Sequence, residues 1–152
     1  RMSTTVKPIP ILVTGVAVAV GSRVIQAVKP EYEVVHFTLA PAATKEIPLL
    51  LKGQAPKDPS SDLGSGNWDV FPKALVFGGG YTDEMIEAVQ KAVAAETEGV
   101  KRIPWLRVDS SIPHPTDPAE YAPFVTKRLK ATLKKLEEEG KFDADHHEIR
   151  KF

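Results

Sequence analysis

The sequence predicts one α/β domain in which helices flank a parallel sheet of about four strands. Two observations support this prediction. Short apolar runs alternate with segments of helical periodicity from residue 9 onward, and this alternation implies crossover connections between parallel strands. The chain has 152 residues, of which 42% are hydrophobic, and this is enough to bury one core.

The first half of the chain predicts two strands and two helices. Residues 9–15 form a continuous apolar run that ends in a glycine, which is typical of a strand buried on both faces. Residues 18–28 place aliphatic side chains on one helical face and end before a proline. The β-branched and aromatic run 33–39 predicts a second strand. Residues 42–52 predict a short helix that Gly53 ends.

A long loop separates the two halves, because residues 53–72 combine prolines, glycines and serines without periodicity. The second half then predicts strands at 74–77 and 104–108, with a helix over 83–95 between them. A last helix over 118–139 opens on a capping sequence and has an apolar stripe. Strands and helices therefore alternate on both sides of the loop.

The simplest closure of this element order is the strand order 2-1-3-4 of flavodoxin-like sheets. We assign residues 1–142 to a single three-layer, Rossmann-like domain, and residues 143–152 to a charged C-terminal tail. Open sheets of this kind bind ligands at the carboxyl ends of the strands, where the strand order reverses. We therefore look for binding residues in the loops that follow the strands.

The composition excludes several classes of partner and cofactor. Twenty basic and twenty acidic side chains cancel, so we expect no binding to nucleic acid or to a membrane surface. There are no cysteines, which rules out disulfides and thiolate zinc sites. His146 and His147 are adjacent and poorly placed to close one tetrahedral site, so we predict no metal centre. Since no spanning segment or hydrophobic leader is evident, we expect a cytoplasmic protein.

The turn after the first predicted strand resembles a nucleotide-binding turn. Gly15 and Gly21 match the outer glycines of the Thr-Gly-x-x-Gly-x-x-Gly turn of extended short-chain dehydrogenases and NmrA-like proteins. This resemblance implies NAD(P) as a candidate cofactor. Val18 stands at the central glycine, where its side chain would obstruct a pyrophosphate, and residues 38–41 lack the acidic ribose partner. The alternative is a structural turn that needs only a tight bend.

A second glycine turn lies between the predicted strand 74–77 and the helix that follows it. It consists of Gly78, Gly79 and Gly80. Such a run allows positive φ angles and leaves backbone amides bare beside a helix N-terminus, where an anion is favoured. Thr82 is placed to cap that helix. Two acidic residues in its first turn would repel a phosphate, so the alternative is again a structural turn.

The third candidate follows the predicted strand 104–108. Arg107, Asp109 and Ser110 lie at the same edge as both glycine turns, with His114 beyond them, and could bind a polar ligand or transfer a proton. The alternative is that Asp109 and Ser110 cap turns while Arg107 forms a salt bridge. His36 lies within a strand and is expected to be a core histidine with a satisfied partner.

The patterns of several common enzymes are missing, because no Tyr-x-x-x-Lys pair, Gly-x-Ser-x-Gly elbow or P-loop is present. Over nearly its full length the chain resembles a family of small uncharacterised fungal proteins. The resembling stretches are Pro10-Ile11-Leu12, Pro30-Glu31-Tyr32-Glu33-Val34-Val35-His36, Gly78-Gly79-Gly80-Tyr81-Thr82-Asp83, and Pro104-Trp105-Leu106-Arg107 before Asp109. This resemblance implies an intact, self-contained domain and brings no activity with it.

Three hypotheses of function follow from these observations. The first is a non-catalytic Rossmann-like domain that binds a nucleotide or another small anion at the glycine-lined edge. The second is a small enzyme that uses Asp109, Ser110 and Arg107. The third is a homodimeric interaction protein, since the edges of a small sheet need covering.

Overall fold

A computed structural model describes residues 7–143 and 149–152 of the chain. Its sheet has five parallel strands in the order β2-β1-β3-β4-β5. The strands are β1 Ile9–Gly15, β2 Tyr32–Leu39, β3 Leu75–Phe77, β4 Trp105–Arg107 and β5 Ile149–Lys151. The helices are α1 Val18–Ala27, η1 Ala40–Ala42, α2 Ala43–Leu50, α3 Asp83–Ala94, α4 Pro118–Glu138 and η2 Lys141–Asp143. The predicted α/β class and the order of the first four strands are confirmed.

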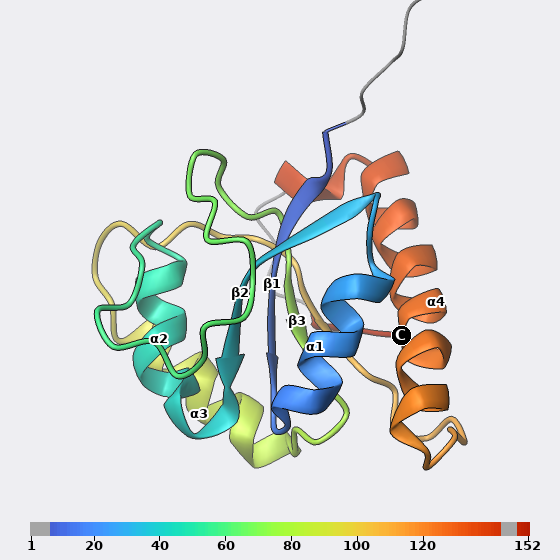
Figure 1. The fold of residues 1–152 in the computed structure, drawn as a ribbon. Coiled ribbons are helices and arrows are strands. Elements are labelled where there is room, and N and C mark those ends of the chain that lie inside the picture. The colour runs from blue at the N-terminus through green and yellow to red at the C-terminus, as the bar shows by residue number, and fades with distance from the viewer. Residues whose placement is uncertain (1–6, 144–148) are drawn as a thin grey trace, which may run out of the picture.

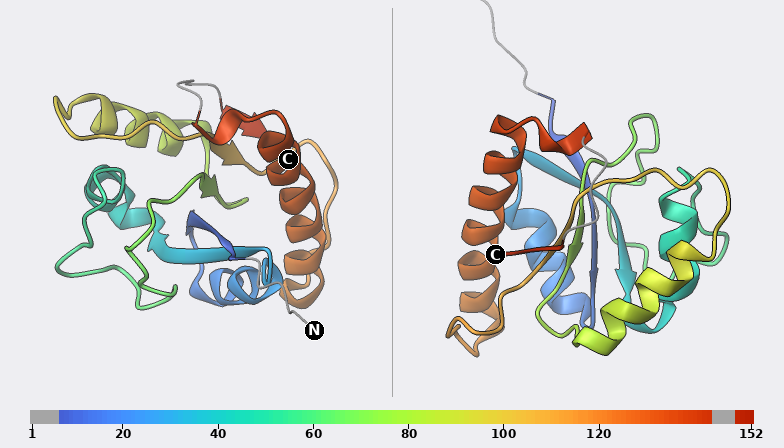
Figure 2. Two further views of the ribbon diagram at one scale, coloured as in Figure 1. Left: turned by 90° about the horizontal axis from the view of Figure 1, so that it is seen from above. Right: turned by 180° about the vertical axis from the view of Figure 1, so that it is seen from behind.

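The molecule has three layers, with the sheet between two pairs of helices (Figures 1 and 2). Helices α1 and α4 pack together on one face, and α2 and α3 pack together on the other. Successive side chains of β1 therefore enter different cores. Ile11 and Val13 join the core under α1 and α4, whereas Leu12 joins the core under α2 and α3. This double burial explains the continuous apolar run in the sequence.

The predicted starts of α3 and α4 are confirmed by their caps. The Thr82 hydroxyl accepts a hydrogen bond from the Met85 backbone N–H at 3.2 Å. The Asp117 carboxylate accepts one from the Ala119 N–H at 2.9 Å. These caps fix the first turns of both helices beside the carboxyl ends of β3 and β4. None of the helices within the described ranges is both long and apolar enough to cross a membrane.

The C-terminal residues correct the predicted strand number and the predicted charged tail. Residues 149–151 form β5, which pairs in parallel with β4, and Phe152 is only 4% exposed. The Phe152 N–H donates to the Arg107 carbonyl at 3.0 Å, and its own carbonyl accepts from the Asp109 N–H at 2.7 Å. Three residues are too few to show periodicity, so only pairing within the fold reveals this strand. His146 and His147 lie outside the described residues.

The predicted long loop runs along the outer edge of β2 and covers it. The Phe37 N–H donates to the Leu63 carbonyl at 3.2 Å. The Ser65 and Gly66 N–H groups donate to the Val34 and Val35 carbonyls at 2.8 and 2.9 Å. An uncovered edge strand would present these backbone groups to other chains. The loop therefore closes the β2 side of the sheet without adding a regular strand.

Candidate functional site

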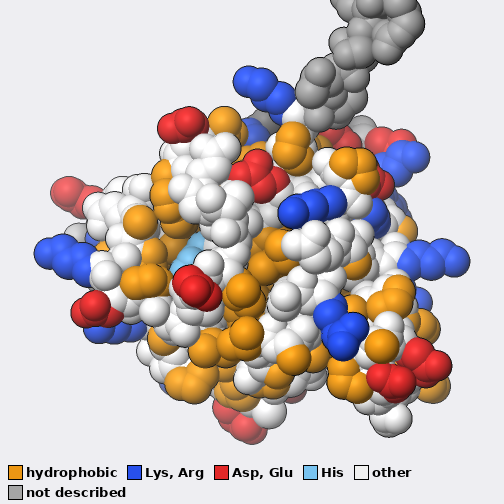
Figure 3. Space-filling view, in the orientation of Figure 1, with side chains coloured by type: hydrophobic (Ala, Val, Ile, Leu, Met, Phe, Trp, Pro, Cys, Tyr) orange, Lys and Arg blue, Asp and Glu red, His pale blue; other side chains and the backbone are white. Residues whose placement is uncertain are grey.

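A cavity of about 290 Å³ lies at the carboxyl edge of the sheet, beside the ends of β1 and β3. The strand order reverses here, because β2 and β3 lie on opposite sides of β1. The lining residues are Val13, Gly15, Val16, Ala17, Val20, Gly21, Val24, Phe37, Gly78, Gly79, Gly80, His114 and Tyr121. The carboxyl ends of β1 and β2 lie toward the bottom of Figure 1. In the same orientation, Figure 3 shows hydrophobic side chains gathered on the lower part of the molecular surface. The two predicted glycine turns thus meet at one cavity.

The glycines of the first turn make room for Phe37 of β2. A Cβ atom at Gly21 would lie 2.6 Å from two carbons of the Phe37 ring, and one at Gly15 would lie 3.3 Å from them. Gly21 is also buried within α1. Gly21 is therefore explained by packing of α1 against the sheet, and Gly15 by the closeness of the Phe37 ring on the neighbouring strand β2. The spacing that resembles a dinucleotide-binding turn has a local structural cause here.

The second glycine turn also serves close packing. Gly78, Gly79 and Gly80 do not adopt the positive φ angles that glycine allows, since they are absent from the described glycines that have them. A Cβ atom at Gly80 would lie 2.5 Å from the Val16 side chain, and one at Gly79 would meet the Tyr121 hydroxyl. The two turns and the start of α4 can approach one another only because these positions lack side chains.

Tyr121 and His114 form the polar part of the cavity wall. The Tyr121 hydroxyl lies against Gly79, in the space that a Cβ atom there would need, and burial raises the pKa of Tyr121. The His114 ring packs edge-on against Tyr121, with centroids 5.1 Å apart. Nδ1 of His114 donates to the Pro115 carbonyl at 3.0 Å, so Nε2 carries the lone pair of the neutral ring.

The starts of α1 and α3 differ in how they would receive an anion. Helix α1 has no side-chain cap and no acidic residue in its first turn. Helix α3 is capped by Thr82 and carries Asp83 and Glu84 in its first turn. The partial positive charge of a helix N-terminus is therefore already offset at α3 and not at α1. An anionic group in the cavity is favoured on the α1 side.

The remaining predicted site residues do not line the cavity. Arg107 donates to the Asp83 carboxylate at 2.6 Å and to the Tyr81 carbonyl at 3.4 Å. Asp109 accepts from the N–H and the hydroxyl of Ser111 at 3.0 and 2.6 Å. These bonds with Ser111 lower the pKa of the Asp109 carboxyl. Ser110 is exposed in the same turn, so the structure does not gather this set into one site.

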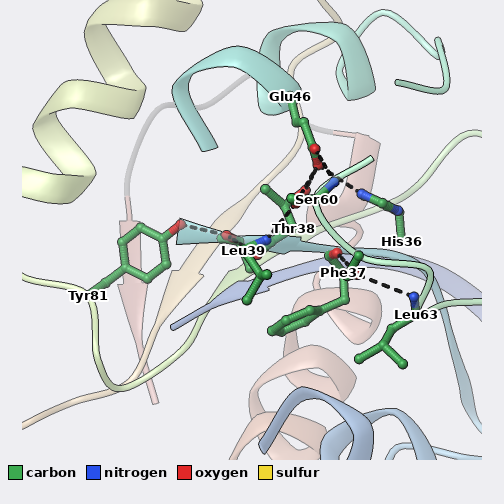
Figure 4. Close-up of polar contacts among 10 residues, drawn as sticks. His36, Phe37, Thr38, Leu39, Glu46, Ser60, Leu63 and Tyr81 are labelled. Carbon is green, nitrogen blue, oxygen red and sulfur yellow. Dashed lines mark hydrogen bonds and ion pairs between the residues drawn. The ribbon is translucent and has the colours of Figure 1, made fainter. Parts of the chain in front are cut away.

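A buried polar cluster joins β2, α2 and the long loop (Figure 4). The Glu46 carboxylate, 2% exposed, accepts from His36 Nε2 at 2.9 Å and from the Thr38 hydroxyl at 3.0 Å. It also accepts from the N–H and hydroxyl of Ser60 at 2.6 and 3.1 Å. Burial alone would raise the pKa of Glu46, but these hydrogen bonds outweigh it and hold the pKa below its usual range. The prediction that His36 is a satisfied core residue is confirmed.

This cluster contains the residue types of a hydrolase triad in a different arrangement. In a triad the histidine lies between the serine and the carboxylate. Here Ser60 and His36 both bond directly to Glu46, and the Ser60 hydroxyl donates to that carboxylate and not to His36. Ser60 Oγ instead accepts from the Leu39 N–H at 2.9 Å. One signal was available in the sequence: Glu46 lies on the same side of its predicted helix as the apolar Leu50.

A second cavity, of about 470 Å³, lies at the opposite end of the sheet. Its lining includes Gln90 and Val93 of α3, Lys101 of the connecting loop and Trp105 at the start of β4. Open parallel sheets bind ligands at their carboxyl ends, and this cavity is at the amino ends. The carboxyl-edge cavity is therefore the better candidate site despite its smaller volume.

Comparison with known proteins identifies a relative for nearly the whole chain. The chain is 38% identical over 152 aligned residues to a protein of Aspergillus oryzae (strain ATCC 42149 / RIB 40) described as "Kojic acid related protein 6". The alignment covers 94% of this chain and 89% of that protein. No protein-family model and no solved structure matches the chain. The expected resemblance to a fungal protein is confirmed, and the chain belongs to the same family as Kojic acid related protein 6.

Proposed function

We propose that the chain is a non-catalytic binding domain that holds a small molecule in the carboxyl-edge cavity. One observation carries this proposal: glycines from two separate turns line a single cavity at the point where the strand order reverses. Ligands of open parallel sheets bind at this point, because several loops converge there around a rigid scaffold.

The lining supports a compact ligand with an apolar body and one anionic or acceptor group. No lysine, arginine, aspartate or glutamate is among the lining residues of this cavity, and most of the side chains are aliphatic. The uncapped start of α1 favours an anionic group on one side. His114 and Tyr121 offer hydrogen-bonding groups on the other. A nucleotide is a candidate ligand only if its phosphate lies beside the N-terminus of α1.

The absence of catalysis is proposed from the state of the polar side chains nearby. Arg107 is engaged by Asp83, and Asp109 is engaged by its own turn. The buried Glu46 already accepts several hydrogen bonds. A group that must move a proton needs a free position within hydrogen-bonding reach of its substrate. We therefore favour binding over chemistry at this edge.

A thermal-shift titration tests the proposal. The compounds are NAD(H), NADP(H), FMN, ATP and phosphate, together with kojic acid, because the name of the A. oryzae relative contains it. We expect at least one compound to raise Tm with increasing concentration, since binding to the folded state stabilises it.

Two matched alanine-to-leucine variants locate that effect. Ala17→Leu enlarges a residue that lines the carboxyl-edge cavity, and Ala94→Leu enlarges one that lines the other cavity. The proposal predicts loss of the Tm increase in Ala17→Leu and its retention in Ala94→Leu. The opposite pattern, or no Tm increase with any compound, would overturn it.

A second candidate function is self-association, which two exposed valines favour. Val16 and Val18 are 54% and 45% exposed and adjoin the carboxyl-edge cavity. An apolar surface beside a cavity suits a protein contact as well as a ligand. Light scattering tests this alternative: a homodimer that becomes monomeric in the Val16→Ser, Val18→Ser double variant supports it, and a monomeric wild type rejects it.

A further inference from the structure

We infer that Tyr121 selects the ligand of the carboxyl-edge cavity: it closes the second glycine turn to diphosphates and offers a hydroxyl donor to a one-ring ligand bearing a carbonyl or carboxylate oxygen. This inference rests on the proposed function, because it concerns the ligand of the same cavity. It adds a chemical class and names the residue that sets it.

The first step concerns the space beside the second glycine turn. In a dinucleotide-binding turn, glycine lets a phosphate approach the backbone closely. In this chain the Tyr121 hydroxyl already lies against Gly79. The space beside Gly79 is filled by Tyr121, and the space beside Gly80 is filled by Val16. A diphosphate would therefore find no room beside Gly79 or Gly80.

The second step concerns the proton of the Tyr121 hydroxyl. A tyrosine hydroxyl can donate its hydrogen to an acceptor. No protein acceptor for it is found within residues 7–143 and 149–152. Tyr121 also lines the cavity. An oxygen atom of a ligand in the cavity is the acceptor that this arrangement lacks.

The third step concerns size and shape. The cavity volume of about 290 Å³ is at the small end of ligand sites, which range over roughly 300–1,000 Å³. Val20 and Val24 of α1 contribute aliphatic walls, and the rings of His114 and Tyr121 meet edge to face. Apolar walls with one hydroxyl donor suit a single planar ring with one acceptor oxygen.

The inference is tested by titrating the isotope-labelled full chain and following its backbone amide NMR signals. The probes are benzoate and benzamide, which carry the same ring with a charged or a neutral acceptor, and inorganic pyrophosphate and NAD+. We expect both ring compounds to shift the signals of cavity residues such as Gly79 and Gly80. Pyrophosphate and NAD+ should leave the Gly79 signal unchanged.

Two tyrosine-to-phenylalanine variants assign the effect to the hydroxyl. Tyr121→Phe should weaken the binding of both ring compounds about fivefold to tenfold, as expected for one lost hydrogen bond. Tyr32→Phe is the control, because Tyr32 is buried at the amino end of β2, whereas the cavity lies at the carboxyl edge. This variant should leave the binding of both ring compounds unchanged.

The other outcomes of these experiments distinguish failure of the inference from failure of the proposed function. A shift of the Gly79 signal by pyrophosphate or NAD+ in the wild type overturns the inference and leaves the proposed function standing. Unchanged affinity of Tyr121→Phe for both ring compounds also overturns the inference and leaves the proposed function standing. If neither ring compound nor kojic acid binds while a nucleotide, FMN or phosphate does, the ligand class is wrong. If nothing binds at this cavity, the proposed function fails and the inference fails with it.

Discussion

The cavity at the carboxyl edge and the Glu46 cluster at the β2 edge are built on opposite principles. The cavity is lined by glycines and mostly aliphatic side chains, and its polar side chains are those of His114 and Tyr121. The cluster concentrates a carboxylate, an imidazole and hydroxyls in the protein interior, and each has a partner. The comparison shows that the richest polar chemistry in a fold can be structural, while the candidate binding site is mainly apolar.

The difference follows from what each region must satisfy. A buried carboxylate is costly unless several donors surround it, so Glu46 fixes Thr38, His36 and Ser60 in place. This tie holds the long loop across β2. The cavity has no such demand, because no lysine, arginine, aspartate or glutamate is among its lining residues. The predictions below test this contrast between a structural polar cluster and a mainly apolar cavity, beginning with the largest expected effect.

Glu46→Ala should cost about 3–5 kcal/mol of unfolding free energy, because it leaves buried donors without an acceptor. Urea unfolding measures this loss. Amide hydrogen exchange should show faster exchange at Ser65 and Gly66, whose N–H groups bond to β2. Glu87→Ala on the exposed side of α3 is the control and should change stability by less than about 0.5 kcal/mol. A loss below about 1 kcal/mol for Glu46→Ala would show that the cluster does not hold the loop.

Gly21→Ala should cost about 1–3 kcal/mol, because the new methyl group would overlap the Phe37 ring. Urea unfolding checks the value, with the exposed neighbour Ser22→Ala as control. Phe37→Leu makes space at the same place, so the double variant should lose less stability than the two single losses combined. Additive losses would mean that Gly21 has another role.

Glu46→Gln should destabilise the protein by about 1–2 kcal/mol at neutral pH, since one charged acceptor becomes a neutral amide. The pKa of Glu46 in the folded state is below its usual value of 4.5. Its stabilising effect is therefore full above pH 4.5 and is lost as the pH falls below 4.5 through the folded-state value. Unfolding curves at several pH values should show the wild type and variant converging in acid. If the stabilities of the wild type and the variant instead converge as the pH is raised, the pKa of Glu46 in the folded state is raised and not lowered.

Asp83→Asn should change stability by less than about 0.5 kcal/mol, because Asp83 is 81% exposed and its ion pair with Arg107 is screened by solvent. Thermal unfolding checks this expectation. The variant should also keep any ligand-induced rise in Tm, since neither residue lines the cavity. Loss of that rise would return Arg107 to the candidate site.

Much of the fold could be predicted because periodicity, caps and glycine stops agree along the chain. The Thr82 cap and the apolar run of β1 are examples. Strand β5 could not be predicted, because three residues with two positive charges acquire strand structure only by pairing with β4. Patterns of local sequence do not contain such pairing.

The candidate site could be located but not explained from the sequence. Gly15 and Gly21 were visible as a turn, yet their cause is the Phe37 ring, which lies on a different strand. Tyr121 was not predicted because its contact with Gly79 joins residues far apart in the chain. The Glu46 cluster was missed for the same reason, since its donors come from β2 and the long loop.

The most direct test of the binding proposal is a crystal structure grown with the compound that raises Tm most in the thermal-shift titration. The proposal predicts ligand density beside Gly15 and Gly78–Gly80, with an acceptor oxygen within hydrogen-bonding distance of the Tyr121 hydroxyl. Density in the cavity beside Trp105, or on the turn at Asp109, with the carboxyl-edge cavity empty, would contradict it.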